Sequence, residues 1–401
     1  MHHIHWGKMK RKLKILLTSY SPFKQSGGPI STYFIAKGLK NLGHEVYIAS
    51  TGLYPKDIET IIIPKYKKIP LFWLQKIISK RIFSKIIKDK KIDIIHSQGR
   101  LTAPGTVLAA KENNILSAVH FRSVEWLCPN GTCLRRDGSK YKIATYKEII
   151  KNNSGRKLFW NIYKWYTIKS WWKIIKSADI KISISNFIKD KMKTIGIDSS
   201  VLYNPREFPV LKFTKEALKK KYGLKKIVFT YIGRLHYPKG IPILLKVMPP
   251  ILEENKDVSF VIVGKGELKE KIKKLEQKYK NLVLIGEVPF ERMGEIYSLS
   301  DVVFCPSIVD EALSGVVVES IIHGKPIIGS NTGGTPEILR NDINGYNIDP
   351  FDYKTWTLKI KKLIKDKKLR ERMGRESKKI SSLFKIKRVA EKLEARYNKV
   401  R

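Results

Sequence analysis

The chain has 401 residues, of which 42% are hydrophobic and 29% are charged, a composition typical of globular proteins. Because one hydrophobic core rarely serves a chain of this length, we expect two domains. No run of about 18 apolar residues occurs, so we predict no transmembrane helix. The formal net charge of +43 favours polyanionic partners, among them nucleic acid, anionic lipid surfaces and phosphorylated substrates.

The three cysteines, Cys128, Cys133 and Cys305, are too few for a disulfide framework and fit a reducing cytoplasm. Cys128 and Cys133 lack a second pair of ligands, so we predict no metal site. The basic residues before Ile15–Leu17 imitate a signal peptide. The apolar stretch is short, however, and we interpret it as the first strand.

The first half of the chain alternates strands and helices. We predict strands at Leu13–Thr18, Glu45–Ser50, Ile92–His96, Ala118–His120 and Ile180–Ser185, with a helix at Pro29–Leu42. Such alternation predicts βαβ units and a parallel sheet covered on both faces.

Two segments of this half are both basic and apolar. In Phe72–Lys91 isoleucines recur at helical spacing between lysines, which predicts a basic amphipathic helix. In Lys157–Lys173 lysines alternate with tryptophans and tyrosines, a combination found at bilayer interfaces. Packing of these aromatic rings in the core, with only the lysines solvated, is the alternative interpretation.

The second half repeats the pattern after Tyr203–Pro209, where two prolines interrupt it. Strands are predicted at Ile227–Ile232, Val258–Val263, Leu282–Ile285, Val302–Cys305, Pro326–Gly329 and Tyr346–Ile348. Helices are predicted at Ile241–Glu254, Leu268–Lys278, Phe290–Ser298, Val317–His323 and Lys385–Lys399. The fold class is therefore α/β, with two doubly wound Rossmann-like domains facing each other across a cleft. We place the domains at 1–206 and 207–380, and expect a C-terminal helix in 381–401 that packs back toward the first domain.

The segment after strand Ile227–Ile232 suits a diphosphate. Gly233 allows close backbone approach, Arg234 can hold a phosphate through two parallel hydrogen bonds, and Lys239 adds a second charge at a helix start. An ordinary basic loop is the alternative in a chain so rich in lysine.

Two glutamates, Glu311 and Glu319, lie eight residues apart after the strand Val302–Cys305. On one straight helix they would be roughly 12 Å apart, which suits the two ends of an elongated ligand. Glu319 could accept hydrogen bonds from a ribose diol, and Glu311 could meet hydroxyls at the far end. Ser314 and Gly315 offer backbone N–H groups between them. Two solvated surface glutamates are the alternative.

These motifs together resemble the family 4 (group 1) glycosyltransferases, which are retaining enzymes with the glycosyltransferase B fold. The matching segments are Gly233-Arg234-Leu235-x3-Lys239-Gly240, Glu311-x7-Glu319, Gly324-x-Pro326 and Gly333-Gly334-x-Pro336-Glu337. The resemblance implies catalytic roles for His120, Arg234, Lys239 and Glu311. It implies donor binding by Gly27, Gly28, Gly233, Arg234, Lys239, Glu311, Leu313, Ser314, Gly315, Val316 and Glu319. The chain departs from the family in having Ala312-Leu313-Ser314 after Glu311, where Gly-Phe-Gly is common, and Phe121-Arg122 after His120.

The resemblance implies transfer of a hexose from a nucleotide diphosphate-sugar, with UDP or GDP, to an acceptor hydroxyl without cofactor or metal. The acceptor would be a glycan or a lipid-linked precursor at an anionic membrane surface, reached from the cytoplasm by a peripheral protein. A nucleotide-sugar epimerase of the same fold, a basic nucleic-acid-binding protein and an inactive transferase-like subunit are the alternatives. No nucleic-acid-binding motif occurs, so we expect no nucleic-acid partner.

Overall fold

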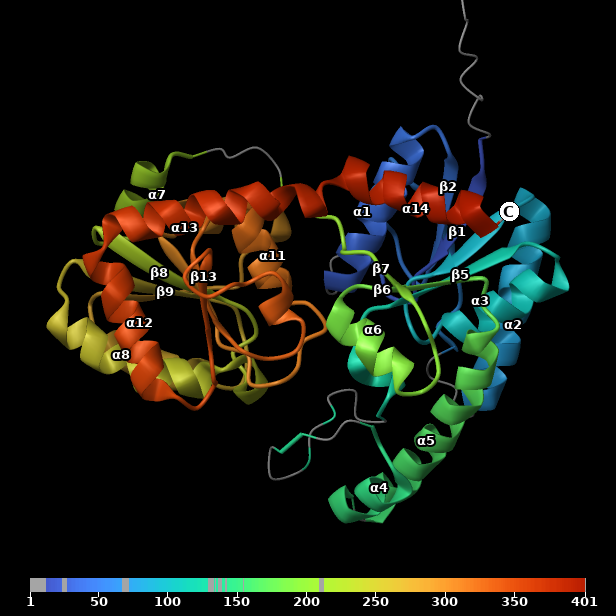
Figure 1. The fold of residues 1–401 in the computed structure, drawn as a ribbon, viewed down its shortest axis with the longest axis horizontal. Helices are drawn as coiled ribbons and strands as arrows, with labels where there is room; N and C mark the ends of the chain where they lie inside the picture. Colours follow the sequence, from blue (N-terminus) through green and yellow to red (C-terminus); the bar gives the residue numbers. More distant parts are fainter. Residues whose placement is uncertain are drawn as a thin grey trace, which may run out of the picture. The chain divides into compact units, whose positions relative to one another are not determined.

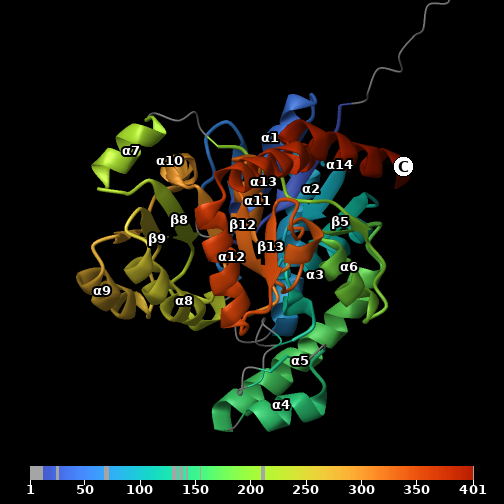
Figure 2. The same ribbon diagram turned by 60° about the vertical axis from the view of Figure 1, so that its left-hand side comes forward.

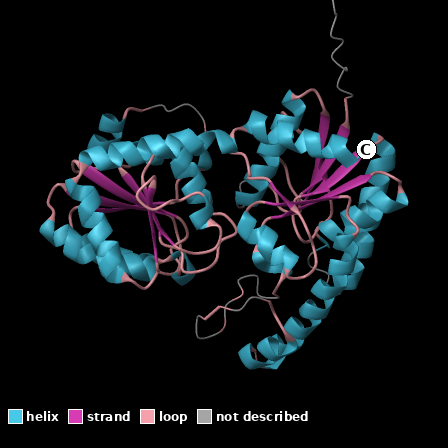
Figure 3. Ribbon diagram, in the orientation of Figure 1, coloured by secondary structure: helices cyan, strands magenta, loops and turns pink. Residues whose placement is uncertain are grey.

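The structure, a computed structural model, describes residues 12–23, 27–66, 72–128, 133, 135, 139–140, 143–153, 155–208 and 213–400 (Figure 1). It contains two sheets, and helices cover both faces of each (Figure 3). Within the set of strands β1–β5, each pair of neighbouring strands is parallel, and the same holds within the set β8–β13. The predicted α/β class with two parallel, doubly wound sheets is therefore confirmed.

The first sheet has seven strands in the order β3-β2-β1-β4-β5-β6-β7. Its strands are β1 (Lys14–Thr18), β2 (Glu45–Ser50), β3 (Glu59–Ile62), β4 (Ile94–Ser97), β5 (Leu116–Phe121), β6 (Ile180–Ser183) and β7 (Ser200–Val201). The helices that alternate with β1–β5 are α1 (Gly27–Asn41), α2 (Phe72–Lys90) and α3 (Ala103–Glu112). The predicted strands are present, and β3 and β7 were not predicted.

Helix α2 packs its apolar face into the protein. Phe83, Ile86 and Ile87 are buried in one cluster with strand residues of β1, β2 and β4. Lys80 pairs with Glu112 of α3, with 2.8 Å between Nζ and Oε1. The outward face of this amphipathic helix is therefore mostly cationic, with Trp73 near its start half exposed.

The aromatic segment forms α5 (Gly155–Lys176), preceded by α4 (Tyr146–Asn152) and followed by α6 (Asn186–Lys193). The core interpretation of α5 holds for part of its aromatic rings, and the bilayer interpretation stays a prediction. Trp165 and Trp171 are buried, whereas Phe159, Trp160 and Tyr166 have exposed fractions of 67%, 40% and 60%. None of the described helices is long and apolar enough to cross a membrane.

By their contacts the described residues group into two compact units. Unit 1 lies within Met1–Phe121, Tyr166–Ile182 and Val389–Arg401, and unit 2 within Arg122–Trp165 and Ser183–Arg388. Most of α14 (Ile386–Val400) belongs to unit 1, where the Tyr397 hydroxyl lies 2.8 Å from His96 Nδ1. The domain limits proposed from the sequence stay a prediction.

The second sheet has six strands in the order β10-β9-β8-β11-β12-β13. They are β8 (Ile227–Ile232), β9 (Val258–Val263), β10 (Leu282–Gly286), β11 (Val302–Cys305), β12 (Ile327–Ser330) and β13 (Gly345–Ile348). The helices are α7 (Lys215–Lys221), α8 (Ile241–Glu254), α9 (Lys269–Lys278), α10 (Met293–Leu299), α11 (Gly315–Ile322), α12 (Tyr353–Lys365) and α13 (Lys367–Ile380). Short 3-10 turns occur at Val124–Trp126, Tyr237–Lys239, Phe290–Arg292, Thr335–Glu337 and Ser381–Phe384.

The core of unit 2 contains three stacked phenylalanine rings on neighbouring strands. Phe229, Phe260 and Phe304 of β8, β9 and β11 have ring centroids 5.5 to 5.7 Å apart. Trp356 of α12 lies against Phe304 and is fully buried. Helices α8 and α12 contact one another beside this sheet (Figure 2). Burial of these large rings fixes the strand ends that carry the candidate site.

Candidate functional site

The candidate site lies where the strand order of the second sheet reverses. Strand β8 pairs with β9 on one side and with β11 on the other. Gly233 and Arg234 follow β8, and the segment that leads to Glu311 follows β11. In open α/β sheets, ligands bind beyond the carboxyl ends of strands at such a switch point. The topology thus brings the two sequence motifs to one edge of the sheet.

The loop after β8 is fixed by Tyr231 and Gly240. The buried Tyr231 hydroxyl donates to the carbonyl oxygens of Arg234 and Lys239, at 2.8 and 3.4 Å. Burial raises the pKa of Tyr231, so the hydroxyl keeps its proton. Gly240 has a φ of +80°, and a Cβ there would lie 1.8 Å from the Pro306 carbonyl oxygen. Only glycine lets this loop pack against the segment after β11.

Lys239 and Glu311, predicted from separate motifs, form an ion pair. Lys239 Nζ lies 3.0 Å from Glu311 Oε1, and the Ser307 hydroxyl donates to the same oxygen. The Glu311 side chain is 17% exposed. Its backbone is held by Gly334, whose N–H donates to the Glu311 carbonyl oxygen at 2.8 Å. The carboxylate therefore stays partly open to solvent on a fixed backbone.

Glu319 lies within α11 and is held by two groups that the sequence did not reveal. The Tyr297 hydroxyl donates to Glu319 Oε2 at 2.7 Å, and Arg206 Nε lies 3.4 Å from Oε1. Burial raises the pKa of Glu319, and Arg206 opposes this shift. Burial also lowers the pKa of Arg206, which Glu319 opposes. No local motif marks Arg206 or Tyr297. The only signal was the basic residue that follows Asn204-Pro205.

The segment from Asp310 to Val316 is anchored at several points. The Ser185 hydroxyl donates to the Ala312 carbonyl oxygen at 2.6 Å. Asp310 accepts from the Gly333 N–H at 3.1 Å and pairs with Lys140 at 2.6 Å. Gly315 and Val316 are the first two residues of α11. Their N–H groups therefore lie at the positive end of the helix dipole.

The Arg234 side chain is exposed and makes no ion pair with any residue that the structure describes. Three further predicted residues, Gly27, Gly28 and His120, lie in unit 1. Gly27 and Gly28 begin α1. His120 lies in β5, is fully buried and stacks on His96 with ring centroids 5.7 Å apart. The roles of these four residues, like those of the other predicted site residues, stay predictions.

Within the described ranges, no cluster of three or more His, Cys, Asp or Glu side chains could hold a metal ion. Cys128 and Cys133 are buried with their sulfur atoms 2.8 Å apart. They are two potential ligands, and no other side chain that the structure describes completes a set with them.

Two family models match the chain: Glycosyltransferase Family 4 over residues 26–207 and Glycosyl transferases group 1 over residues 214–380. Spore coat protein SA of Bacillus subtilis is 35% identical over 228 residues, which are 53% of this chain and 60% of that protein. An uncharacterized glycosyltransferase of Methanocaldococcus jannaschii is 25% identical over 92% of this chain and 93% of its own length.

Among solved structures, Anabaena HepE in complex with UDP-glucose has a TM-score of 0.70 at 16% identity, covering 96% of this chain and 100% of that one. A likeness at this identity shows the shared fold. The predicted glycosyltransferase B fold is thereby confirmed.

Proposed function

Because the chain belongs to the group 1 glycosyltransferases of family 4, we propose that it transfers a hexose from a nucleotide diphosphate-sugar to an acceptor hydroxyl. The nucleotide is UDP or GDP, and the configuration at the sugar carbon is retained. The observation that carries the donor class is the convergence of the Lys239–Glu311 pair and the Arg206–Glu319–Tyr297 group on one loop and helix. The UDP-glucose bound to the Anabaena protein supports the same donor class.

The diphosphate is assigned to the loop after β8. Arg234 is exposed and can present two parallel N–H groups to a phosphate. Lys239 pairs with Glu311 at 3.0 Å, so a bound diphosphate would compete with this carboxylate for the ammonium. The N–H groups of Gly315 and Val316 at the start of α11 add donors. Gly233, whose own N–H donates to the Val263 carbonyl oxygen at 3.0 Å, lets the ligand approach the backbone closely. This arrangement frees Glu311 to meet hydroxyls of the sugar when the donor binds.

The nucleoside is assigned to α11. Glu319 is already oriented by Tyr297 and Arg206, and a carboxylate has about four acceptor positions. Two of these positions are used within the protein, so two remain for the two hydroxyls of a ribose. Leu313 and Ser314, which also belong to the proposed donor site, lie on the chain between the ribose end and the sugar end.

The reaction breaks the bond between the anomeric carbon and the diphosphate oxygen, and forms a bond from that carbon to the acceptor oxygen. With attack and departure on one face, the acceptor proton passes to the leaving diphosphate. Rate then depends on stabilising negative charge on that group, the role of Arg234, Lys239 and the α11 N-terminus. These groups supply the positive charge from the chain itself, and we propose that no metal is needed.

The acceptor we propose is a glycan or lipid-linked precursor at an anionic membrane surface. Support comes from α5, where exposed Phe159, Trp160 and Tyr166 stand among lysines. Aromatic rings and lysines together favour the headgroup region of a bilayer. In this proposal the protein acts as a peripheral enzyme on the inner face of the membrane.

The test begins with a panel of nucleotide sugars, measured by thermal shift and then by turnover. For the donor that binds, Lys239→Met should lower turnover by about 100-fold or more, as loss of a group that stabilises developing charge does elsewhere. Lys273→Met removes an exposed lysine of α9 and serves as the matched control. Activity should persist in EDTA. Turnover of Lys239→Met near that of the control would refute the assignment, and an epimerised donor would indicate the epimerase instead.

A further inference from the structure

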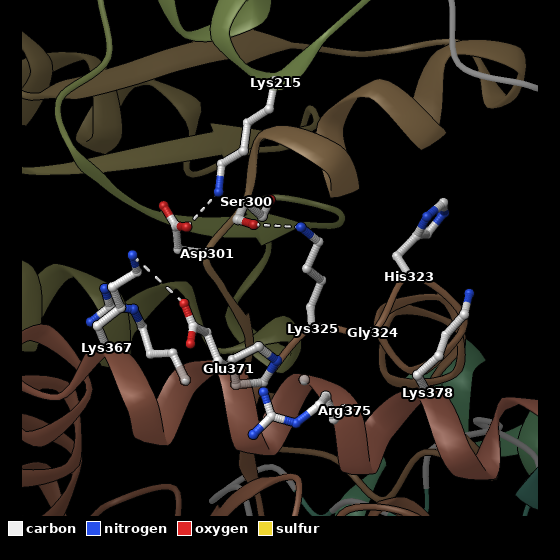
Figure 4. A pocket seen from close by; sticks show the side chains of 13 residues that line it. Lys215, Ser300, Asp301, His323, Gly324, Lys325, Lys367, Glu371, Arg375 and Lys378 are labelled. Carbon is white, nitrogen blue, oxygen red and sulfur yellow. Dashed lines mark hydrogen bonds and ion pairs between the residues drawn. The ribbon is translucent and has the colours of Figure 1, made fainter.

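Unit 2 has a concave feature at the edge of its sheet opposite the proposed donor residues. A cavity of about 580 Å³ opens beside the amino ends of β11 and β12, next to α13 and the turn after α11 (Figure 4). The proposed donor residues follow the carboxyl ends of β8 and β11, so this cavity is not part of the donor site. Six basic side chains line it: Lys215, Lys325, Lys367, Arg370, Arg375 and Lys378.

The floor of the cavity is built by close backbone packing. A Cβ at Gly374 of α13 would lie 2.5 Å from the Gly324 carbonyl oxygen, and Gly324 has a φ of +62°. The Ser377 hydroxyl donates to the Lys325 carbonyl oxygen at 2.9 Å. These contacts lay α13 directly across the turn after α11, which is the contact of the two helices seen in Figure 1. The basic side chains are thus carried on fixed backbone.

The two acidic residues of the lining do not balance this charge. Asp301 pairs with Lys215 at 2.5 Å and with Lys219 at 3.5 Å. Glu371 pairs with Lys367 at 3.7 Å, one turn away on α13 (Figure 4). Four cations of the lining, Lys325, Arg370, Arg375 and Lys378, therefore face the cavity without a carboxylate partner among the described residues.

Capping of helix ends explains three of these four cations in part. Lys325 donates to the carbonyl oxygens of Ser298 and Ser300 at 3.1 and 2.8 Å. Arg370 donates to the last turn of α12, and Lys378 donates to the Ile322 carbonyl oxygen at 2.7 Å. A helix end offers only about half a negative charge, so net positive charge remains at each.

Arg375 has no such role. Its guanidinium makes no hydrogen bond or ion pair with any residue that the structure describes, although it lies on the cavity wall between Glu371 and Lys378 (Figure 4). Burial, with Lys215, also lowers the pKa of Lys325 to about 8. Burial and neighbouring positive charge both disfavour the protonated form of Lys325, and an anion bound beside it would stabilise that form.

From this geometry we propose that the cavity is a binding site for a small phosphate-bearing anion, separate from the donor site. Its volume lies in the range of small-molecule sites, and guanidinium and ammonium groups match phosphate oxygens. A soluble phosphorylated metabolite and the headgroup of an anionic lipid share this chemistry. Occupation would neutralise the cations that α13 and the turn after α11 bring together.

The experiment uses the full chain carrying Arg234→Gln and Lys239→Gln, so that the proposed donor clamp no longer competes. Inorganic diphosphate is titrated calorimetrically at constant ionic strength, and phosphatidylglycerol vesicles are tested in parallel by sedimentation. Arg375→Gln is compared with Arg372→Gln, an exposed arginine of the same helix that does not line the cavity. Both variants lose one charge and no described contact.

We expect saturable binding that Arg375→Gln weakens about tenfold and Arg372→Gln leaves within about twofold. Dependence on Arg375 in the diphosphate titration identifies a soluble ligand, and dependence only with vesicles identifies a headgroup. No saturable binding to either probe, or equal weakening by the two variants, overturns the proposal, because the positive charge would then act only as a diffuse field.

Discussion

The role proposed for Glu319 is tested by replacing it with glutamine, which keeps the size of the side chain and removes its charge. In the structure the carboxylate accepts one hydrogen bond from Tyr297 at 2.7 Å and lies 3.4 Å from Arg206 Nε. Two of its roughly four acceptor positions therefore remain for a ribose diol. In Glu319→Gln the amide offers a neutral oxygen to one hydroxyl only.

The expected loss follows from the difference between charged and neutral acceptors. A hydrogen bond to a charged group contributes about 1.5–3 kcal/mol, and a neutral one about 0.5–1.5 kcal/mol. One of the two bonds should weaken by about 1–1.5 kcal/mol, and the other, which contributes about 1.5–3 kcal/mol, is lost. The substitution should therefore cost about 2.5–4.5 kcal/mol of nucleotide binding, a factor of about 70 to 2,000 in Kd. Arg206 is only 9% exposed and loses its counter-charge, so the melting temperature should fall as well.

The assay separates these two effects by changing the ligand as well as the protein. Calorimetry at pH 8 compares the nucleoside diphosphate that binds with its 2′-deoxy analogue, in wild type and in Glu319→Gln. Wild type should lose about tenfold in affinity on removal of the hydroxyl, and the variant only about twofold. Glu295→Gln, which removes the charge of a buried glutamate paired with Arg292, is the matched control. If Glu319→Gln discriminates the two ligands as strongly as wild type does, Glu319 does not bind the ribose.

Three further predictions concern the loop after β8, the acid stability of unit 2 and the exposed face of α5. Gly240→Ala should lower the melting temperature well below that of Gly43→Ala, because Gly43 shares a positive φ but has no atom within 4 Å of an added Cβ; equal losses would show that the contact with Pro306 does not matter. Burial lowers the pKa of His323 from 6.5 to about 4. As the pH falls, the unfolded chain therefore binds a proton at a higher pH than the folded chain does. The free energy of unfolding should fall by about 2 kcal/mol between pH 6.5 and 4, a value reduced for the partial exposure of the ring. His323→Gln should remove that part of the slope in melting curves recorded between pH 7 and 4, and an unchanged slope contradicts the reasoning. Trp160→Ser should weaken sedimentation with phosphatidylglycerol vesicles several-fold more than the buried-face control Trp165→Phe, and equal binding would exclude this face of α5.

Strands with a buried, β-branched pattern were predictable from the sequence alone. Strands β2, β8, β9 and β11 have the limits that the pattern indicates. Strand β3 was missed because Glu59 and Ile62 are exposed and its four residues carry no buried run. Strand β7 has only two residues, too few for any periodicity. Both of these strands exist because a neighbouring strand offers hydrogen bonds, which is tertiary information.

Some residues of the candidate site were likewise predictable from the sequence, and others were not. Lys239 and Glu311 could be found because each stands in a short motif at the end of an apolar strand. Arg206 and Tyr297 could not, since an arginine in a linker and a tyrosine in a helix have no pattern of their own. They meet Glu319 only because α10 packs on the face of strands β8, β9 and β11 and the linker passes α11. Contacts between residues distant in sequence, made by side chains of ordinary type, are what single-sequence reasoning leaves out.

The departure from the family at Ala312-Leu313-Ser314 has a physical basis in unit 2. The Ser314 side chain is buried, and its hydroxyl lies 3.0 Å from the sulfur of Cys305, at the end of β11. The Ser314 hydroxyl thus faces the core. Burial raises the pKa of Cys305 to about 12, so the thiol that it meets stays protonated. Leu313 packs at the edge of the same apolar cluster, while Ala312 is held through its carbonyl oxygen by Ser185. Because these three residues are engaged within the protein, the difference from glycine and phenylalanine acts first on the shape and stiffness of the loop that carries Glu311.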